Sequence, residues 1–281
     1  MSRIIFILAL LSLSCQAKAQ LVYPVVGSYK SKSAQGMAVW NNEAFLFSHG
    51  GRCRVLDLNT GKVIREFMLA SGDSTNHVNN ACFGAEMVEK SRQSVIYISE
   101  CKPRHRCFVE CLNDSGATLV QTIEARNKNG KEIGALTWVV DTEKRFLYGI
   151  TRNGSKLNST GVVYNYVNKY RLPKLSEGSN VILGPDDLLE RFVLKFPNIL
   201  QGAKIRNGIL YIVTGLQQTA AGRKDAQRAI QVVELEKKEL VKTIDLTYVT
   251  TNEPEDIDFY NGKCLLYCGQ NGGIYEVDLN K

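Results

Sequence analysis

Histidine, proline and tryptophan are scarce in this chain, with three, six and two copies among 281 residues. No serine lies in the Gly-x-Ser-x-Gly context of a nucleophile elbow, and no loop carries the closely spaced aspartates of a calcium site. Beyond the first 20 residues, no stretch is apolar enough to cross a membrane as a helix. These absences exclude nucleophile-elbow hydrolases and EF-hand-type calcium proteins, and they predict no membrane span.

Positive charge is in excess, but it is dispersed. The net charge is +7, with small clusters at Lys102-Arg104-Arg106 and Arg223-Lys224-Arg228. No basic stripe interleaved with aromatic residues occurs, although surfaces that bind nucleic acid usually carry one. The charge therefore predicts a solvated surface with mild attraction to anionic surfaces or glycans, and no nucleic-acid partner.

The N-terminal segment differs in kind from the rest. Arg3 precedes an apolar run, Ile4 to Leu13, and Ala17-Lys18-Ala19 matches a small-x-small cleavage site. Residues 1–19 are therefore predicted to be a signal peptide, and residues 20–281 one domain of a secreted or periplasmic protein. The alternative is an outer-membrane lipoprotein attached through Cys15, although Ser12 stands where the lipid-attachment pattern usually has an aliphatic residue.

One outline of strands and turns recurs along the chain. Between Ala34 and Leu58, three apolar runs of strand length are separated by turns rich in Asn, Ser and Gly, and Lys62 to Leu69 adds a fourth run. The outline returns from Leu200 and again from Pro254. A repeat of about 45 residues with four strands is typical of a propeller blade. We predict an all-β, five-bladed β-propeller.

The two ends of the chain are predicted to complete one blade together. Leu21 to Tyr29 forms a lone strand, and the last repeat supplies only three strands. Pro24 suits an outermost edge strand, because proline cannot donate to a neighbouring strand. The N-terminal strand should therefore close the fifth blade. The third repeat is the most degenerate, with one helical turn expected over Asp186–Leu189, so four or six blades are the alternative counts.

Seven cysteines follow Cys15. Cys101 and Cys107 flank a short loop between two strands, where a disulfide is feasible if both side chains share a face. A metal site formed by these two with His105 is the alternative, although the spacing matches no structural zinc pattern. Three other cysteines occupy positions that fit the buried faces of core strands: Cys82, Cys264 and Cys268.

The start of the innermost strand and the end of the second strand of each blade should lie on one face of a propeller. These positions carry amides, carboxylates, a cation, an imidazole and an indole, which is the chemistry of polar ligand recognition. Trp138 is expected to act as a stacking platform. The predicted ligand-binding set is Gln35, His49, Asn80, Glu100, Trp138, Arg152, Gln201, Gln217, Glu255 and Gln270.

Structural roles compete with this interpretation. Gln35 and Gln201, each followed by glycine, would serve equally to bond neighbouring backbone around the channel. Glu100 and Glu255 would pair with Arg152 or a nearby lysine as surface ions. His49 is more typical of a polar rim than of a general base. A cation held by Glu253 and Glu255 with channel carbonyls is a further alternative; no cofactor is specified by any motif.

Three motifs resemble the plant-type and bacterial glutamine cyclotransferases. They are Gln35-Gly36-Met37, the turn from Leu56 to Val63 (LDLNTGKV), and Gln201-Gly202. The resemblance implies a secreted five-bladed propeller whose blades open with Gln-Gly. The family places a catalytic acid at the end of the first blade's second strand, where this chain has Ser48-His49-Gly50.

These features together predict a monomeric recognition module that binds a small polar ligand, glycan or peptide at the channel mouth. One alternative is an enzyme of the cyclotransferase or hydrolase kind that uses Glu100 or Glu255, because ring closure of an N-terminal glutamine needs a carboxylate to move the proton. The other is a protein–protein interaction scaffold.

Overall fold

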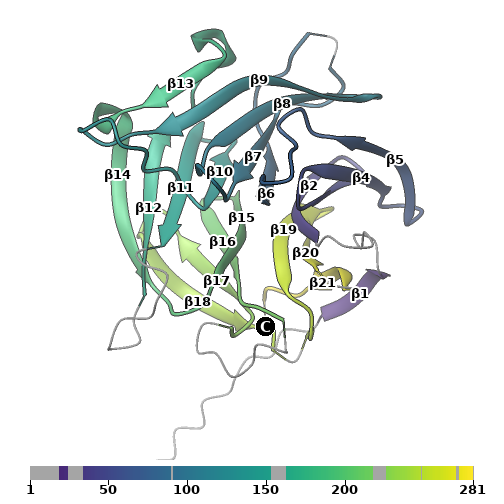
Figure 1. Cartoon of the computed structure of the whole chain (residues 1–281). Helices are drawn as coiled ribbons and strands as arrows, with labels where there is room; N and C mark the ends of the chain where they lie inside the picture. The colour runs from purple at the N-terminus through teal and green to yellow at the C-terminus, as the bar shows by residue number, and fades with distance from the viewer. Residues whose placement is uncertain are drawn as a thin grey trace, which may run out of the picture.

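The computed structural model describes residues 19–24, 34–89, 91–152, 163–217, 226–247, 249–269 and 272–280. Within these ranges, strands β1 to β21 form five separate sheets that surround one axis (Figure 1). The chain is thus a five-bladed β-propeller, as predicted. The first 18 residues, which hold most of the predicted signal peptide, lie outside the described residues.

Each blade contains four antiparallel strands that run outward from the axis in sequence order, except that β1 is the outermost strand of the fifth blade. The first two blades contain β2 (Ala34–Trp40), β3 (Glu43–Ser48), β4 (Arg52–Asp57), β5 (Lys62–Met68), and then β6 (Val78–Phe83), β7 (Ile96–Glu100), β8 (Cys107–Asn113) and β9 (Gly116–Ala125). The third and fourth contain β10 (Thr137–Asp141), β11 (Phe146–Arg152), β12 (Tyr164–Arg171), β14 (Leu188–Lys195), and then β15 (Leu200–Arg206), β16 (Ile209–Thr214), β17 (Ala229–Glu234) and β18 (Glu239–Asp245). The fifth contains β19 (Pro254–Tyr260), β20 (Lys263–Cys268), β21 (Gly273–Val277) and β1 (Ala19–Pro24).

Tight turns rich in asparagine and glycine set the hairpins between first and second strands. Asn207 and Gly208 both have positive φ, at 51° and 74°, and Asn261 and Gly262 have 49° and 80°. Two consecutive left-handed residues are the requirement of a type I′ turn, whose twist matches that of the flanking strands. The Asn-Gly dipeptides therefore fix these hairpins locally.

The N-terminal strand closes the ring, as the sequence predicts. β1 pairs antiparallel with β21, from Ala19 opposite Val277 to Pro24 opposite Gly273. The hydroxyl of Tyr23 donates to the carbonyl of Leu58, which belongs to the first blade. The first and last segments of the described chain are thus held together at the outer edge of the fifth blade, which would otherwise be unpaired.

One strand lies where the sequence did not predict it. After β12 the chain leaves the third blade, forms the short 3-10 helix η1 (Leu175–Glu177), and adds β13 (Asn180–Leu183) in parallel to β9 of the second blade. The 3-10 helix η2 (Pro185–Asp187) then returns it to β14 (Figure 1). The second blade consequently has five strands, and the helical turn predicted near Asp186 is confirmed.

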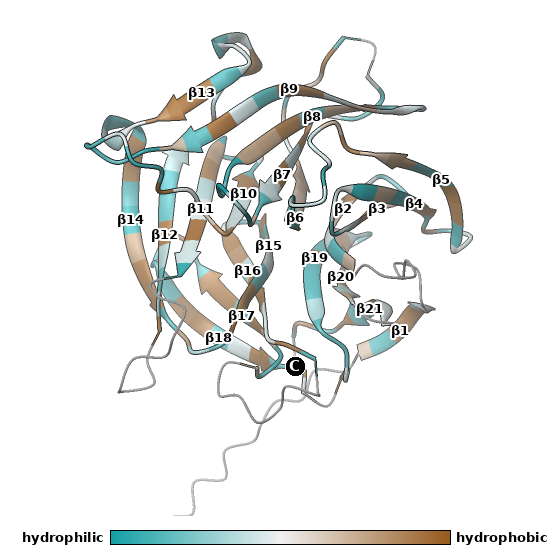
Figure 2. Cartoon of the chain, in the orientation of Figure 1, coloured by the Kyte–Doolittle hydropathy of each residue, from teal (hydrophilic) through white to brown (hydrophobic). Residues whose placement is uncertain are grey.

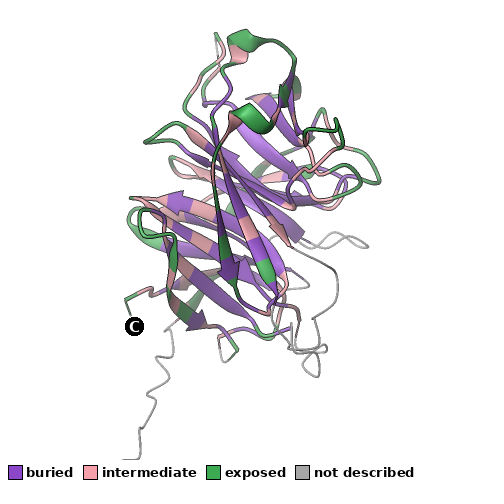
Figure 3. Cartoon of the chain, turned by 90° about the vertical axis from the view of Figure 1, so that its left-hand side faces the viewer, coloured by how far each residue is buried: buried purple, intermediate pink, exposed green. Residues whose placement is uncertain are grey.

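Apolar side chains are packed between neighbouring blades, one cluster for each pair. Phe45 and Phe108 lie between the first and second blades, and Trp138 and Tyr97 between the second and third. The remaining three clusters join the third to the fourth, the fourth to the fifth, and the fifth back to the first blade. Buried residues accordingly dominate the inner strands, whereas the loops and the outer strands carry exposed residues and the strands are mixed in hydropathy (Figures 2 and 3).

Two polar side chains close the axis itself. Asp256 accepts backbone hydrogen bonds from Met37 at 2.7 Å and Ala81 at 3.3 Å, so it joins the fifth blade to the first and second. Asn80 accepts from the backbone N–H of Ala203 at 2.7 Å and donates to the carbonyl of Trp138 at 2.8 Å. These bonds connect the innermost strands of all five blades, and they satisfy backbone groups that are buried away from water.

The glycines of the two Gln-Gly motifs make this closure sterically feasible. A Cβ at Gly202 would lie 2.1 Å from Oδ1 of Asp256, and one at Gly36 would lie 3.1 Å from the nitrogen of Ala81. The innermost strands approach too closely for a side chain at Gly202 and leave only tight space for one at Gly36. Glycine is therefore required by packing at the axis rather than by a turn.

All seven described cysteines are free thiols. The disulfide considered between Cys101 and Cys107 is not formed. Cys107 is packed in the apolar cluster between the second and third blades, whereas Cys101 is half-buried in the loop between β7 and β8. Burial raises the pKa of the Cys107 thiol well above its usual value. Cys82, Cys264 and Cys268 are buried core residues, as predicted.

Candidate functional site

The innermost strands of four blades begin with the same irregularity. In β2, β6, β15 and β19, the register with the second strand shifts by one residue near the start of the strand. Such a bulge re-aims the side chain that it carries. The bulges place Gln35, Asn79, Gln201 and Glu255 at equivalent positions around one end of the axis, which we call the channel mouth. In the third blade, which has no shift, Thr137 opens β10 at this level.

Hydrogen bonds link these residues across blades. Nδ2 of Asn79 donates to Oγ1 of Thr137 at 2.8 Å and to the carbonyl of Gln201 at 3.1 Å, and the Thr137 hydroxyl donates to the same carbonyl. Nε2 of Gln201 donates to the carbonyl of Gly215 and, at 2.8 Å, to Oε1 of Glu253. Gln201 therefore both ties neighbouring backbone together and orients a carboxyl group.

Two carboxyl groups, those of Glu253 and Glu255, lie close to each other at the channel mouth. Glu255 is 2% exposed, and its Oε1 has no hydrogen-bond partner among the described residues. Burial raises the pKa of Glu255 well above its usual value, and the nearby Glu253 and Asp256 raise it further. Burial also raises the pKa of Glu253, which the hydrogen bond from Gln201 opposes. The channel mouth thus holds carboxyl groups that retain their protons to higher pH than an ordinary glutamate does.

Gly269 makes room for the unpartnered oxygen. A Cβ at this position would lie 2.4 Å from Oε1 of Glu255, and the backbone N–H of Gly269 donates to the carbonyl of Glu253. The following residue, Gln270, is a predicted site residue that lies outside the described residues. Gln217 is half-buried and borders residues 218–225, which also lie outside them.

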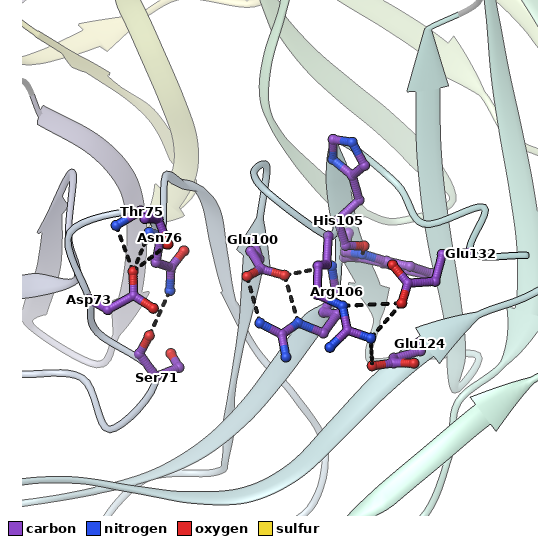
Figure 4. A network of polar contacts seen from close by, with 11 residues as sticks. Ser71, Asp73, Thr75, Asn76, Glu100, His105, Arg106, Glu124 and Glu132 are labelled. Carbon is purple, nitrogen blue, oxygen red and sulfur yellow. Dashed lines mark hydrogen bonds and ion pairs between the residues drawn. The ribbon is translucent and has the colours of Figure 1, made fainter.

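Glu100 is committed to an ion pair. The guanidinium of Arg106 donates two hydrogen bonds to Glu100, from Nε to Oε2 at 2.8 Å and from Nη2 to Oε1 at 2.7 Å. The backbone N–H of Arg106 donates a third to Oε2 (Figure 4). The Glu100 side chain is buried, and its hydrogen bond raises the pKa of Arg106. The pairing of Glu100 with Arg152 considered from the sequence is wrong, since Arg152 donates to the carbonyls of Pro197 and Asn198.

His49 belongs to a histidine pair that the sequence did not predict. Its Nδ1 lies 2.8 Å from Nδ1 of His77, and its Nε2 lies 3.2 Å from the carbonyl oxygen of Ser74. Because a carbonyl only accepts, Nε2 of His49 carries a proton. Burial, His49 and Lys102 together lower the pKa of His77 to about 4. No residue pattern in the sequence predicts this pair, because His77 lies 28 residues further along, in the segment that leads from β5 of the first blade to β6 of the second.

Two predicted site residues occupy positions that differ from those expected. Asn80 is fully buried in the axial closure, and Trp138 is buried with its indole N–H donating to the carbonyl of His105 at 2.9 Å. The bulge places Asn79, and the start of β10 places Thr137, at the channel mouth one residue earlier than predicted. Trp138 is therefore unavailable as a stacking platform. A one-residue slip exchanges the faces to which neighbouring side chains point.

No group of three or more His, Cys, Asp or Glu in the described ranges is placed to hold a metal ion, so neither metal alternative gains support. Among the residues that the structure describes, no helix is long and apolar enough to span a membrane. The channel mouth thus combines two carboxyl groups of raised pKa with amide side chains fixed by hydrogen bonds.

Comparison with known proteins adds similarity at the level of structure alone. No protein-family model and no curated protein sequence matches the chain. Among solved structures, the chain is similar to a glutaminyl cyclase. That enzyme, from Myxococcus xanthus, has a TM-score of 0.49 and 13% identity, over 94% of this chain and 97% of the enzyme. The sequence motifs resemble the same class of protein, and the likeness found here is one of fold.

Two further structures are similar over most of the chain. The computationally designed protein Ika8 has a TM-score of 0.40 and 10% identity, over 92% of this chain and 99% of that protein. The Cps50 (Swd1) β-propeller domain of Myceliophteria thermophila has a TM-score of 0.42 and 11% identity, over 87% of this chain and 83% of that domain. Likenesses at this level concern the fold, and the function has to be argued from the residues.

Proposed function

We propose that this propeller binds a small polar ligand at the channel mouth, through an amino group directed at Glu253 and Glu255. The observation that carries the proposal is the buried Oε1 of Glu255, which has no hydrogen-bond partner among the described residues. A buried acceptor without a partner is unfavourable by about 1–3 kcal/mol, and a bound donor would recover this energy.

Charge favours an amine over a neutral donor. Burial raises the pKa of Glu255 most, and repulsion from the neighbouring carboxyl of Glu253 raises it further. An ammonium group placed between them would stabilise their ionised forms and form charge-assisted hydrogen bonds. A free α-amino group, as on a peptide or an amino acid, is the simplest ligand with this chemistry.

Calorimetric titration with glutaminyl-alanine, a dipeptide with N-terminal glutamine, tests the proposal. We expect saturable binding to the wild type and a loss of about tenfold or more in affinity for Glu255→Gln. Glu236→Gln is the matched control, because Glu236 is exposed in the β17–β18 turn, remote from the mouth in sequence. N-acetylated glutaminyl-alanine should bind no better than background. Equal affinity for the free and acetylated peptides would contradict the amine proposal.

Catalysis of the cyclotransferase or hydrolase kind is the second candidate. The observation in its favour is a buried carboxyl whose pKa is raised by burial, as is typical of general acids and bases. Glu100 is less suited, since Arg106 occupies both of its oxygens. Release of ammonia from glutaminyl-alanine, lost in Glu255→Gln and retained in Glu236→Gln, would support catalysis. Binding without ammonia release would support the recognition module.

A further inference from the structure

A second cavity opens between the second and third blades, away from the carboxyl pair. It measures about 370 Å³, and its lining includes His105, Thr151, Tyr166, Asn168 and Arg191. Neither Glu253 nor Glu255 borders it. Deeper between these two blades the contact is apolar, formed by residues such as Trp138 and Tyr170. The interface therefore changes from apolar packing to a polar hollow.

The third blade presents a row of polar groups to this cavity. Asn168 pairs with Arg191 across β12 and β14, and Tyr166 lies two residues from Asn168, so the three share one face of the sheet. Nε of Arg191 donates to Oδ1 of Asn168 at 2.6 Å. The two terminal amino groups of Arg191 make no hydrogen bond within the described part of the chain. The guanidinium is thus held in place with one side of its fork unused.

His105 faces the row from the second blade. Its backbone is left-handed, with φ 60°, and its carbonyl is fixed by the indole of Trp138. The chain at Gly134 packs so closely that a Cβ there would lie 2.2 Å from that carbonyl oxygen. The imidazole points away from the Glu100–Arg106 pair (Figure 4), and its Nδ1 is buried without a partner among the described residues. A strained, firmly held residue with an unused polar atom is typical of a binding site.

The charges around the cavity favour an anion. Four cations, Arg104, Arg126, Lys131 and Arg191, line it or the adjoining cavity, against the carboxylate of Glu132 and that of the neighbouring Glu124. With histidine neutral, four positive and two negative charges leave a net charge of +2. Both carboxylates are already paired, Glu132 with Arg104 and Glu124 with Arg104 and Arg126. The polar groups that have no partner among the described residues here are hydrogen-bond donors, and the two terminal amino groups of Arg191 match the geometry of an oxyanion.

We propose that this inter-blade cavity is a second binding site, for a small ligand that carries a phosphate or carboxylate group. The fork of Arg191 binds the oxyanion, and the Nδ1–H of His105 donates a further hydrogen bond. The hydroxyls of Thr151 and Tyr166 border the same space and suit a polar remainder of the ligand. The proposal is independent of the amine site at the channel mouth.

The test uses nitrogen NMR of the histidine rings in the full-length protein, which has only three histidines. Inorganic phosphate and succinate are titrated separately at constant ionic strength. We expect a saturable shift of the His105 ring nitrogens with at least one of them, while the signals of His49 and His77 stay in place. Whichever anion saturates identifies the oxyanion. If neither produces a saturable shift at His105 up to tens of millimolar, or all three histidines shift in parallel, the proposal is overturned.

Variants supply the second arm. Arg191→Gln should weaken anion binding by about tenfold or more, because it removes charge-assisted hydrogen bonds. Arg206→Gln is charge-matched and lines a different cavity, and it should bind as the wild type does. Arg191→Lys keeps the charge but not the fork, so it should also weaken binding; it replaces Arg191→Gln if that variant does not fold. Unchanged affinity in the Arg191 variants would contradict the site.

Discussion

Replacing Asp256 with alanine should destabilise the propeller strongly, although no apolar core residue is touched. The substitution leaves the backbone N–H groups of Met37 and Ala81 without their acceptor at the axis, where both are buried. Each buried, unsatisfied donor costs about 1–3 kcal/mol, so the free energy of unfolding should fall by about 2–6 kcal/mol. For a chain of this size, such a loss lowers the Tm by roughly 10 °C.

Urea unfolding followed by circular dichroism measures this change. The free energy of unfolding should keep the same slope against urea concentration, because the surface exposed on unfolding is nearly unchanged, while the urea midpoint falls. Asp186→Ala is the control: Asp186 is exposed in η2, and its loss should change stability by less than about 0.5 kcal/mol. Asp256→Asn retains an acceptor and should lose less than Asp256→Ala. If Asp256→Ala unfolds at the same midpoint as Asp186→Ala, the axial closure does not stabilise the ring.

Three other predictions follow from the same contacts. Gly202→Ala should unfold at lower urea than Gly116→Ala, since a Cβ meets Asp256 at 2.1 Å in the first case and nothing within 4 Å in the second; equal midpoints would contradict the close approach. Removal of residues 1–24 unpairs the edge of β21, so gel filtration should show aggregation, whereas a monomer with unchanged Tm would refute closure. The pKa of Glu255 is raised in the folded state, so the stability contributed by this carboxyl is complete below its unfolded-state pKa of about 4.3 and is lost as pH rises through its folded-state pKa. The urea midpoint of Glu255→Gln should therefore fall less steeply from acid to neutral pH than that of the wild type. Midpoints that fall in parallel would refute the buried acid.

Local signals made the blades predictable from the sequence. Turns such as Asn207-Gly208 fix hairpins without help from the rest of the chain, and the lone N-terminal strand with Pro24 announced how the ring closes. β13 was not predictable in this way. It pairs in parallel with the edge of another blade, so its place depends on a tertiary neighbour rather than on its own four residues.

The candidate site was predictable in composition but not in register. Gln35, Gln201 and Glu255 lie at bulges, as their place in the repeat suggested, whereas Asn79 and Thr137 stand one residue before the positions expected. In the second repeat a bulge adds one residue where no glycine marks it, and in the third repeat the strand has no bulge at all. The partners of the predicted residues, such as Arg106 for Glu100, are set by loop conformation and could not be read from spacing.

Proton release on ligand binding tests the central claim most directly. If an ammonium group binds between Glu253 and Glu255, the raised pKa of Glu255 must fall, and the carboxyl gives up its proton to the buffer. Titration of glutaminyl-alanine at one pH, in two buffers of different ionisation enthalpy, should then give different binding enthalpies for the wild type and for Glu236→Gln. The same titration of Glu255→Gln should give enthalpies that differ much less between buffers. Equal enthalpies in both buffers for the wild type, with binding intact, would contradict the role assigned to this buried carboxyl.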